Sequence, residues 1–291
     1  MQKRVLVVGA NGLLGRPVAE ELQRDGFVVR ALVRDIKTAP PGAEIVCGRF
    51  EDEHALDRAL EGCNFVHVTI RPDAADAERV EAGGMAALLA RARQHHIERV
   101  SYVSGMFVDV LPIDHAPEHR AKVLAERHLR AGELPYTIFR PTFFLENLPK
   151  HLQGPFAIVF GRQRHPLRMV AAGDFARQVS RALITPAASG RIFPVLGPEP
   201  IRVHEAVRRY MLLRGLHKPI VSVPFALARA VDAVFNGGRF APTLRIMSAL
   251  NEYGDRGDST EADELLGPNS TTLERLFGGQ SAPHALAAAR A

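Results

Sequence analysis

Short apolar runs alternate with longer segments of helical periodicity through the first half of the chain. The first run, residues 5–8, holds four apolar residues, three of them β-branched, and suits a strand that is buried on both faces. A helix is expected directly after it, because Leu14, Val18 and Leu22 recur at helical spacing and Gly26 stands where a helix would end.

The same alternation continues to about residue 140. We predict further strands over residues 27–33, 44–47, 65–70, 99–104 and 136–139, with helices over 51–61, 74–95 and 118–131. Strict alternation of strands and helices indicates an α/β fold with a doubly wound parallel sheet. In such a sheet the ligand binds beyond the carboxyl ends of the strands.

The alternation ends near residue 145. We therefore expect a first domain over residues 1–145 and a smaller α+β lobe over 146–280, interleaved with the first and closing one wall of the ligand pocket. The lobe should contain a hairpin of strands 156–160 and 167–170 and a strand at 191–196. Its helices are predicted over 174–183, 201–214, 224–235 and 244–250, with a last one opened by the capping-box pattern 271–274. The alanine-rich residues 281–291 are expected to form a flexible tail.

Composition narrows the class of protein. Apolar residues make up 46% of the 291 residues, enough for a sizeable core. No stretch reaches the ~18 uninterrupted apolar residues of a membrane-spanning helix. The first strand begins within four residues of the N-terminus, which leaves no room for a signal peptide, so we expect a cytoplasmic protein. Core packing is the expected role of the apolar helices 224–235 and 244–250, and attachment to a membrane surface is the alternative.

Charge and cysteine content argue against two classes of partner. The formal net charge is +5, but the arginines are scattered and no zinc-finger spacing or basic-aromatic motif accompanies them. We therefore expect no nucleic-acid partner. Cys47 and Cys63 lack a CxxC partner and a cluster of metal ligands, so they are expected to be small buried residues and no metal site is predicted.

The turn after the first strand carries the clearest chemical signal. Three glycines follow the spacing G-x-x-G-x-x-G between the predicted strand and helix. In such a turn Gly9 permits the tight bend, Gly12 lets the backbone approach a pyrophosphate, and Gly15 lets the helix pack closely. The motif predicts a bound dinucleotide. The loop residues expected to hold it are Gly9, Asn11, Gly12, Leu13, Leu14 and Gly15.

Arg34, at the end of the second predicted strand, decides which dinucleotide is expected. An acidic residue there would accept hydrogen bonds from the adenosine ribose and repel a 2′-phosphate, whereas arginine offers a planar set of donors and a positive charge. NADP(H) is therefore favoured over NAD(H). Asp35 leaves an alternative open, since its carboxylate could serve a ribose if Arg34 turned away.

Together with these motifs, the chain resembles the atypical short-chain dehydrogenase/reductases, especially the NmrA-like group. The resemblance covers about half of the chain. It rests on the glycine loop, residues 31–35, Ser104, Lys122 with 125–126, residues 134–141 and residues 143–147. It implies a Rossmann-type NAD(P)-binding domain, oxidoreductase activity, and cofactor contacts from Lys122, Pro141 and Phe143. Thr69 is added to these contacts because it ends the fourth predicted strand.

The chain departs from the family at the catalytic pattern Tyr-x-x-x-Lys. In family enzymes that reduce carbonyls, the tyrosine donates a proton and the lysine holds the ribose. Here the lysine is Lys122 and the position four before it is Glu118, a carboxylate that is ionised at neutral pH unless burial raises its pKa.

Three functions remain possible for such a site. The working prediction is a reductase that uses Lys122 without a tyrosine, on a small apolar acceptor such as an enone, a quinone or a flavin. In the second, Glu118, His119 or Ser104 supplies the proton. In the third, the chain binds the dinucleotide without turnover, as a redox sensor or as an assembly subunit with a protein partner. The sequence leaves the oligomeric state open.

Overall fold

The computed structural model describes residues 2–279, which divide into two compact units. Unit 1 comprises residues 2–141, 172–196 and 256–268, and unit 2 comprises residues 142–171, 197–255 and 269–279. Each unit is therefore built from several stretches of chain. The assignment of residues 146–280 to a substrate-binding lobe stays a prediction, and the predicted tail over 281–291 lies outside the described residues.

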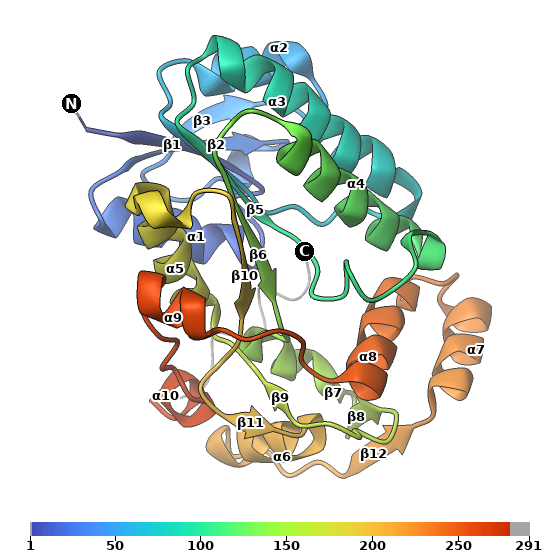
Figure 1. Ribbon diagram of the computed structural model, residues 1–291. Coiled ribbons are helices and arrows are strands. Elements are labelled where there is room, and N and C mark those ends of the chain that lie inside the picture. The colour runs from blue at the N-terminus through green and yellow to red at the C-terminus, as the bar shows by residue number, and fades with distance from the viewer. Residues whose placement is uncertain (1, 280–291) are drawn as a thin grey trace. The chain divides into compact units, whose positions relative to one another are not determined.

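Unit 1 is built around a seven-stranded parallel sheet with the order β10-β6-β5-β4-β1-β2-β3 (Figure 1). The predicted fold class, a Rossmann-type doubly wound sheet, is confirmed. The strand order reverses between β1 and β4, which is where sheets of this kind bind their ligands. The strands are β1 (Arg4–Val8), β2 (Val28–Val33), β3 (Glu44–Cys47), β4 (Phe65–Val68), β5 (Arg99–Val103), β6 (Tyr136–Pro141) and β10 (Arg191–Val195).

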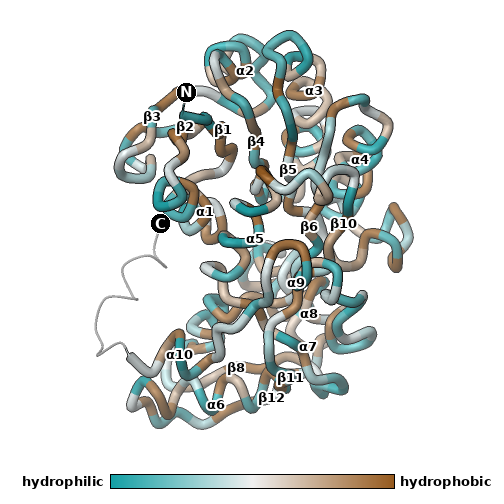
Figure 2. Tube along the Cα trace, turned by 60° about the vertical axis from the view of Figure 1, so that its left-hand side comes forward, coloured by the Kyte–Doolittle hydropathy of each residue, from teal (hydrophilic) through white to brown (hydrophobic). Residues whose placement is uncertain are grey.

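Helices cover both faces of this sheet (Figure 1). On one face α1 (Gly15–Arg24) packs against α5 (Ala172–Ile184), and α9 (Thr260–Leu266) contacts α5 in turn. The other face carries α2 (Glu53–Leu60), α3 (Gly84–Gln94) and α4 (Pro117–Ala131). Along the helices hydrophobic and hydrophilic residues alternate, as expected where one side of a helix faces a core (Figure 2).

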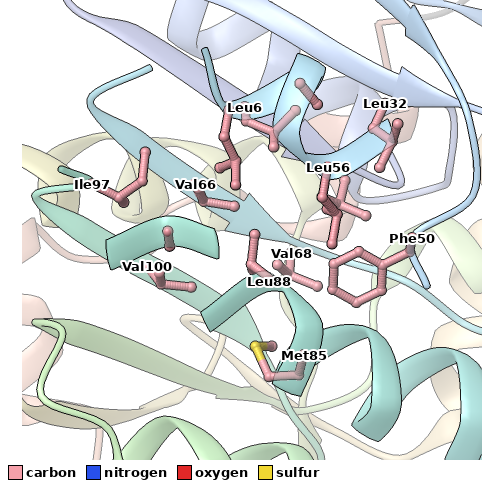
Figure 3. Packing of buried hydrophobic residues seen from close by; sticks show 14 of the residues in the cluster. Leu6, Leu32, Phe50, Leu56, Val66, Val68, Met85, Leu88, Ile97 and Val100 are labelled. Atoms are coloured by element: carbon pink, nitrogen blue, oxygen red, sulfur yellow. The ribbon is translucent and has the colours of Figure 1, made fainter. Parts of the chain in front are cut away.

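The largest core of unit 1 lies between the sheet and the second group of helices. Leu6, Val66 and Val100 on the strands meet Leu56 and Leu88 on α2 and α3 (Figure 3). All five side chains are fully buried. Burial of one such side chain contributes about 1.5–3 kcal/mol, so this layer holds the strands in the register that fixes their carboxyl ends.

Residues 74–95, predicted as one helix, are mostly helical but do not form a regular α-helix. It opens with a 3-10 turn, η2 (Ala74–Asp76), passes into a π-helical turn, η3 (Glu78–Gly83), and continues as α3. A π-helical turn inside an α-helix is uncommon and is frequent at functional sites. Here it places the carboxylate of Glu81 in the interior, where the residue is 1% exposed.

Unit 2 contains two small sheets and four α-helices among its described residues. One sheet joins β7 (Leu152–Gln153), β8 (Phe156–Phe160) and β12 (Ile220–Val223), and the other joins β9 (Leu167–Arg168) and β11 (Pro200–Ile201). The helical segments are η5 (Leu145–His151), α6 (Val203–Leu213), α7 (Phe225–Phe235), α8 (Ala241–Tyr253) and α10 (Leu273–Phe277).

The predicted hairpin of residues 156–160 and 167–170 is wrong. Strand β8 pairs with β7 and β12, while β9 pairs with β11. The connecting loop does not turn back as a hairpin because its backbone is held elsewhere. The N–H groups of Arg162 and Gln163 both donate to Oδ1 of Asn251, at 3.1 and 2.8 Å, and both Gly161 and Gln163 have positive φ.

Two expectations about burial are also corrected. Leu244, Met247 and Leu250 of α8 are buried as expected, but α7 buries only Ala228 and Asp232. Core packing of the segment 224–235 was therefore a wrong prediction. Cys47 is exposed rather than buried, because β3 is an edge strand of the sheet.

The N-terminus of the last helix, α10, differs slightly from the prediction. Thr272 caps α10, since its hydroxyl accepts a hydrogen bond from the Arg275 N–H, so the cap lies one residue later than the predicted box. Between residues 2 and 279, none of the helices has the length and apolar character needed to cross a bilayer.

Candidate functional site

Unit 1 gathers most of the predicted site residues at one edge of its sheet. Gly9 follows β1, Arg34 follows β2, Thr69 follows β4, Ser104 follows β5, and Pro141 ends β6. Because these strands are parallel, their carboxyl ends share one edge. Phe143 belongs to unit 2, so its predicted place beside the cofactor stays a prediction.

The glycine loop is bent so tightly that side chains would not fit at two of its positions. Gly9 has φ +82°, and a Cβ there would lie 2.0 Å from the Thr69 carbonyl oxygen. A Cβ on Gly15 would lie 2.0 Å from the carbonyl oxygen of Gly9. The Gly12 N–H closes the turn by donating to the Gly9 carbonyl at 3.0 Å. The geometry agrees with the roles expected of Gly9 and Gly15, while the approach of a pyrophosphate to Gly12 stays a prediction.

The outer side of the loop is open to a ligand. Asn11 and Gly12 are exposed, and Leu13 is 43% exposed. Helix α1 begins at Gly15, and its N-cap residue, Leu14, offers no side-chain hydrogen bond to the first turn. The first N–H groups of an α-helix lack intrahelical partners and carry partial positive charge, so this uncapped end suits an anionic group.

The loop after β2 separates the roles of Arg34 and Asp35. The Asp35 carboxylate accepts a hydrogen bond from the Lys37 N–H at 3.0 Å and so caps the short helix η1 (Ile36–Thr38). Thr38 joins this loop to the glycine loop, because its Oγ1 accepts from Nδ2 of Asn11 at 3.2 Å. Asp35 thus has a structural task, whereas the Arg34 side chain is exposed at the sheet edge. The contact of Arg34 with an adenosine ribose stays a prediction.

Lys122 on α4 reaches the end of β5 and is held there by two acceptors. Its Nζ donates to Oε1 of Glu81 at 2.5 Å and to the carbonyl oxygen of Val103 at 2.9 Å. The hydroxyl of Tyr102 donates to the same carboxylate oxygen at 2.8 Å, and the Lys122 ammonium lies 5.0 Å from the Tyr102 ring centre. Glu81 is buried, while the Lys122 side chain is 21% exposed. The ammonium is therefore fixed in place and still reachable.

Tyr102 does not replace the missing catalytic tyrosine. Burial, followed by the charge of Glu81 and the hydrogen bond to it, raises the pKa of the Tyr102 phenol well above its usual value. Its hydrogen is already donated to Glu81. The phenol therefore supports Glu81 and stays protonated. Neither Tyr102 nor Glu81 was predicted from the sequence as a site residue. The one available signal was an acidic residue among the apolar positions of the 74–95 helix.

Ser104 shows a feature expected of a ligand site. It is 4% exposed, and its Oγ is buried without a hydrogen-bond partner among the described residues. An unsatisfied buried hydroxyl costs about 1–3 kcal/mol, a cost that a ligand atom in hydrogen-bonding reach would remove. The backbone is fixed, since the Ser104 N–H donates to the Phe139 carbonyl at 2.8 Å.

The two remaining proton-donor candidates lie in the first turns of α4. Glu118 is half-buried, four residues before Lys122. His119 places its Nε2 3.3 Å from the Leu111 carbonyl oxygen, and burial lowers the pKa of its imidazole. His119 is therefore engaged with the preceding loop. Within the described part of the chain, no group of three or more His, Cys, Asp or Glu side chains is placed to hold a metal ion.

Arg140 fixes the end of β6 against α4. Its Nε and Nη2 donate to the two carboxylate oxygens of the buried Glu126, at 2.9 and 2.6 Å, and its Nη1 pairs with Asp109. Burial opposes the charge, but the hydrogen bonds that the guanidinium donates to both carboxylates outweigh it and raise the pKa of Arg140. Arg140 is thus occupied within unit 1 and acts as a structural residue at the sheet edge.

Comparisons with known proteins agree with this geometry. Residues 9–186 match the model of a protein family described as NAD(P)H-binding. The chain is 27% identical over 248 residues to the photosystem II assembly factor Ycf39 of Cyanophora paradoxa, covering 80% of this chain and 77% of that protein. It is 32% identical over 223 residues to a (4-alkanoyl-5-oxo-2,5-dihydrofuran-3-yl)methyl phosphate reductase of Streptomyces griseus subsp. griseus, covering 74% and 75%.

A solved structure shows the same fold. The NADPH-dependent quinone oxidoreductase of Escherichia coli, complexed with NADPH, has a TM-score of 0.74 at 19% identity, over 94% of this chain and 98% of that one. The family match covers more than half of the 291 residues. The chain therefore belongs to the NAD(P)H-binding family, and the resemblance to NAD(P)-binding dehydrogenases and reductases drawn from the sequence is confirmed.

Proposed function

We propose that this protein is an NADP(H)-dependent oxidoreductase of the NmrA-like type that reduces a small apolar acceptor such as an enone, a quinone or a flavin. The observation that carries the proposal is the placement of Lys122 at the end of β5, held by Glu81 and the Val103 carbonyl. A lysine that is 21% exposed and anchored on a buried carboxylate holds its ammonium group at a fixed point beside the ligand edge of the sheet.

Three observations in unit 1 support a fit of its residues to NADP(H). The glycine loop leaves no room for a Cβ at Gly9 or Gly15, α1 is uncapped, and Ser104 Oγ lacks a partner among the described residues. We assign the pyrophosphate to residues 9–15 and the 2′-phosphate to Arg34. Thr69, Lys122 and Pro141 complete the proposed contacts within unit 1. When bound, the reduced nicotinamide supplies the hydride.

Lys122 is proposed to position the reactants. An ammonium group has three N–H donors, and Glu81 and Val103 account for two of them. The third is available to a ribose hydroxyl or an acceptor oxygen, and its charge would stabilise negative charge that develops there. Ser104 offers a hydroxyl at the same edge and is the secondary candidate for contact with the acceptor. Glu118 is a further secondary candidate for proton exchange.

The absence of a tyrosine at position 118 guides the choice of acceptor. Reduction of an activated alkene, a quinone or a flavin depends chiefly on cofactor chemistry and on alignment of the reactants. A reductase is among the relatives, and the E. coli structure with the same fold is a quinone oxidoreductase. A cytoplasmic location remains part of this proposal.

One alternative is favoured by a specific observation. The 27% identical Ycf39 is an assembly factor by name, and Glu118 stands where family reductases have their proton donor. The alternative is therefore a dinucleotide-binding sensor or assembly subunit without turnover. It differs from the main proposal in one measurable property, the oxidation of NADPH.

The test is NADPH oxidation, followed at 340 nm with a panel of enones, quinones and flavins. Lys122→Met should lower kcat at least about tenfold, because an oriented charge is lost from the site. Lys3→Met is the matched control: Lys3 also forms an ion pair with a glutamate, Glu98, but at the opposite end of β1. Full activity of Lys122→Met would refute the role of Lys122. Tight NADPH binding without turnover on any acceptor would favour the alternative.

A further inference from the structure

Helix α7 exposes an apolar surface that the described residues of unit 2 do not cover. Leu227, Val231 and Val234 follow one another at helical spacing and are 55%, 44% and 74% exposed, and Phe235 at the helix end is 80% exposed. Monomeric proteins rarely leave contiguous apolar surface of this kind in water, and such patches mark binding sites. The pattern is not explained by core packing, since α7 buries only Ala228 and Asp232.

The turn from α7 to α8 extends this surface and is firmly built. The carboxylate of Asp232 accepts from the Phe240 N–H at 3.0 and 3.1 Å, and the Asp232 carbonyl accepts from the Gly238 N–H at 3.0 Å. Gly237 and Gly238 both have positive φ, which allows the sharp bend. Phe240, just after the bend, is 49% exposed. The helical pair, visible side by side in Figure 1, thus ends in an apolar tip of fixed shape.

The exposed charges within residues 224–251 are all positive. Within residues 224–251 the only acidic residue is Asp232, which is 3% exposed and engaged in the turn. The same stretch contains three cationic residues, Arg229, Arg239 and Arg245. Helices that lie in the interface of an anionic bilayer combine an apolar face with flanking cationic side chains. Residues 224–251 show this combination, with no exposed carboxylate in the same stretch.

We propose that α7 and the turn to α8 bind the surface of a bilayer that contains anionic lipids. The apolar side chains Val234, Phe235 and Phe240 enter the boundary between head groups and acyl chains, and the exposed Arg229 and Arg239 meet the phosphates. A second copy of this chain suits the surface less well, because two such tips would bring arginines together without carboxylates to pair with them. The proposal does not depend on the proposed enzymatic function, since binding needs neither cofactor nor acceptor.

The experiment is co-sedimentation of the full chain, without NADPH, with vesicles of phosphatidylcholine alone or with about one third phosphatidylglycerol. We expect binding to the mixed vesicles that weakens as salt is raised, because screening shortens the reach of the arginines. The double variant Phe235→Ser, Phe240→Ser should lower the bound fraction at least about fivefold. Arg239→Glu should also lower it while leaving the apolar residues in place.

A matched control distinguishes binding through this surface from nonspecific adsorption through any exposed apolar side chain. Leu212→Ser removes another exposed leucine, 63% exposed on α6 of the same unit, and should leave vesicle binding unchanged. No binding by the wild-type chain, or equal binding by the double variant, would overturn the proposal. So would a wild-type chain that ignores vesicles but forms dimers that the double variant abolishes, since the surface would then join two copies.

Discussion

His67 should make the protein lose stability in mild acid. It lies on β4 with no exposed surface, and its Nδ1 is 2.8 Å from Oγ of Ser101. Ser101 Oγ also lies 3.3 Å from the Val66 carbonyl oxygen, so Nδ1 and the hydroxyl share a hydrogen bond in the interior of the sheet. Its Nε2 is buried without a partner among the described residues, next to the Phe175 ring. A second proton on the imidazole would therefore place a charge in an apolar environment.

The magnitude follows from the change in pKa. Burial lowers the pKa of His67 from 6.5 to about 3. Because the pKa in the folded state is the lower one, this histidine's contribution to stability is fully present above pH 6.5. It is lost as the pH falls from 6.5 towards 3, where the unfolded chain binds a proton that the folded chain does not. At pH 5 the loss amounts to about 2 kcal/mol, from about 1.5 pH units at 1.36 kcal/mol each.

The assay is urea unfolding at pH 8 and pH 5, with the variants His67→Leu and Ser101→Ala. His67→Leu cannot take up the proton, so it should lose about 2 kcal/mol less on acidification than the wild type. Ser101→Ala removes the hydrogen bond but leaves the imidazole buried, and should keep the wild-type dependence on pH. An acid-induced loss that is equal in the wild type and in His67→Leu would refute the reasoning.

Three further predictions concern the ligand edge of unit 1. Arg34→Gln should raise the dissociation constant of NADPH about 10- to 100-fold, because a charge-assisted hydrogen bond is lost. The dissociation constant of NADH should change little. A competition titration in which both constants rise equally would contradict this. Glu81→Gln should lower kcat at least about tenfold while the KM for NADPH changes less, because the anchor of Lys122 is weakened. Unchanged kinetics in a folded variant would exclude a positioning role for Glu81. Gly15→Ala, whose Cβ would lie 2.0 Å from a carbonyl oxygen, should destabilise the fold by about 1–3 kcal/mol and weaken NADPH binding. The control Gly173→Ala, where the new Cβ meets no atom within 4 Å, should do neither in thermal melts and titrations.

The sheet of unit 1 was predictable because its signals are local. Each buried strand is a short apolar run, and each helix shows its periodicity within a dozen residues. The order of parallel strands then follows general rules of connection. The glycine turn next to β1 could likewise be predicted from its spacing, and the structure leaves no room for a Cβ at two of the three positions, Gly9 and Gly15.

Unit 2 was less predictable because its pairing is between distant segments. Strand β8 pairs with β12, about sixty residues later, and nothing within residues 156–170 indicates that partner. The helix α7 shows a different limit. An apolar helix is normally assigned to a core, and only the tertiary structure reveals that the outer face of α7 is left exposed by the described elements of unit 2.

Glu81, the partner of Lys122, could not be predicted from the sequence for a geometric reason. The π-helical turn η3 widens the helix and shifts the phase of every later side chain. A regular 3.6-residue period therefore cannot identify the direction of Glu81. The predicted site residues of unit 1 lie at one sheet edge, but the carboxylate that fixes the lysine came from the structure.

The most direct test of the proposed function is a single-turnover experiment. Protein saturated with NADPH is mixed rapidly with an excess of a small quinone, and absorbance at 340 nm is followed. Oxidation of one NADPH per site, with a rate that is saturable in quinone and strongly reduced in Lys122→Met, is the predicted result. Stable absorbance of the bound NADPH with quinones, enones and flavins alike would contradict an oxidoreductase and leave a dinucleotide-binding protein without turnover.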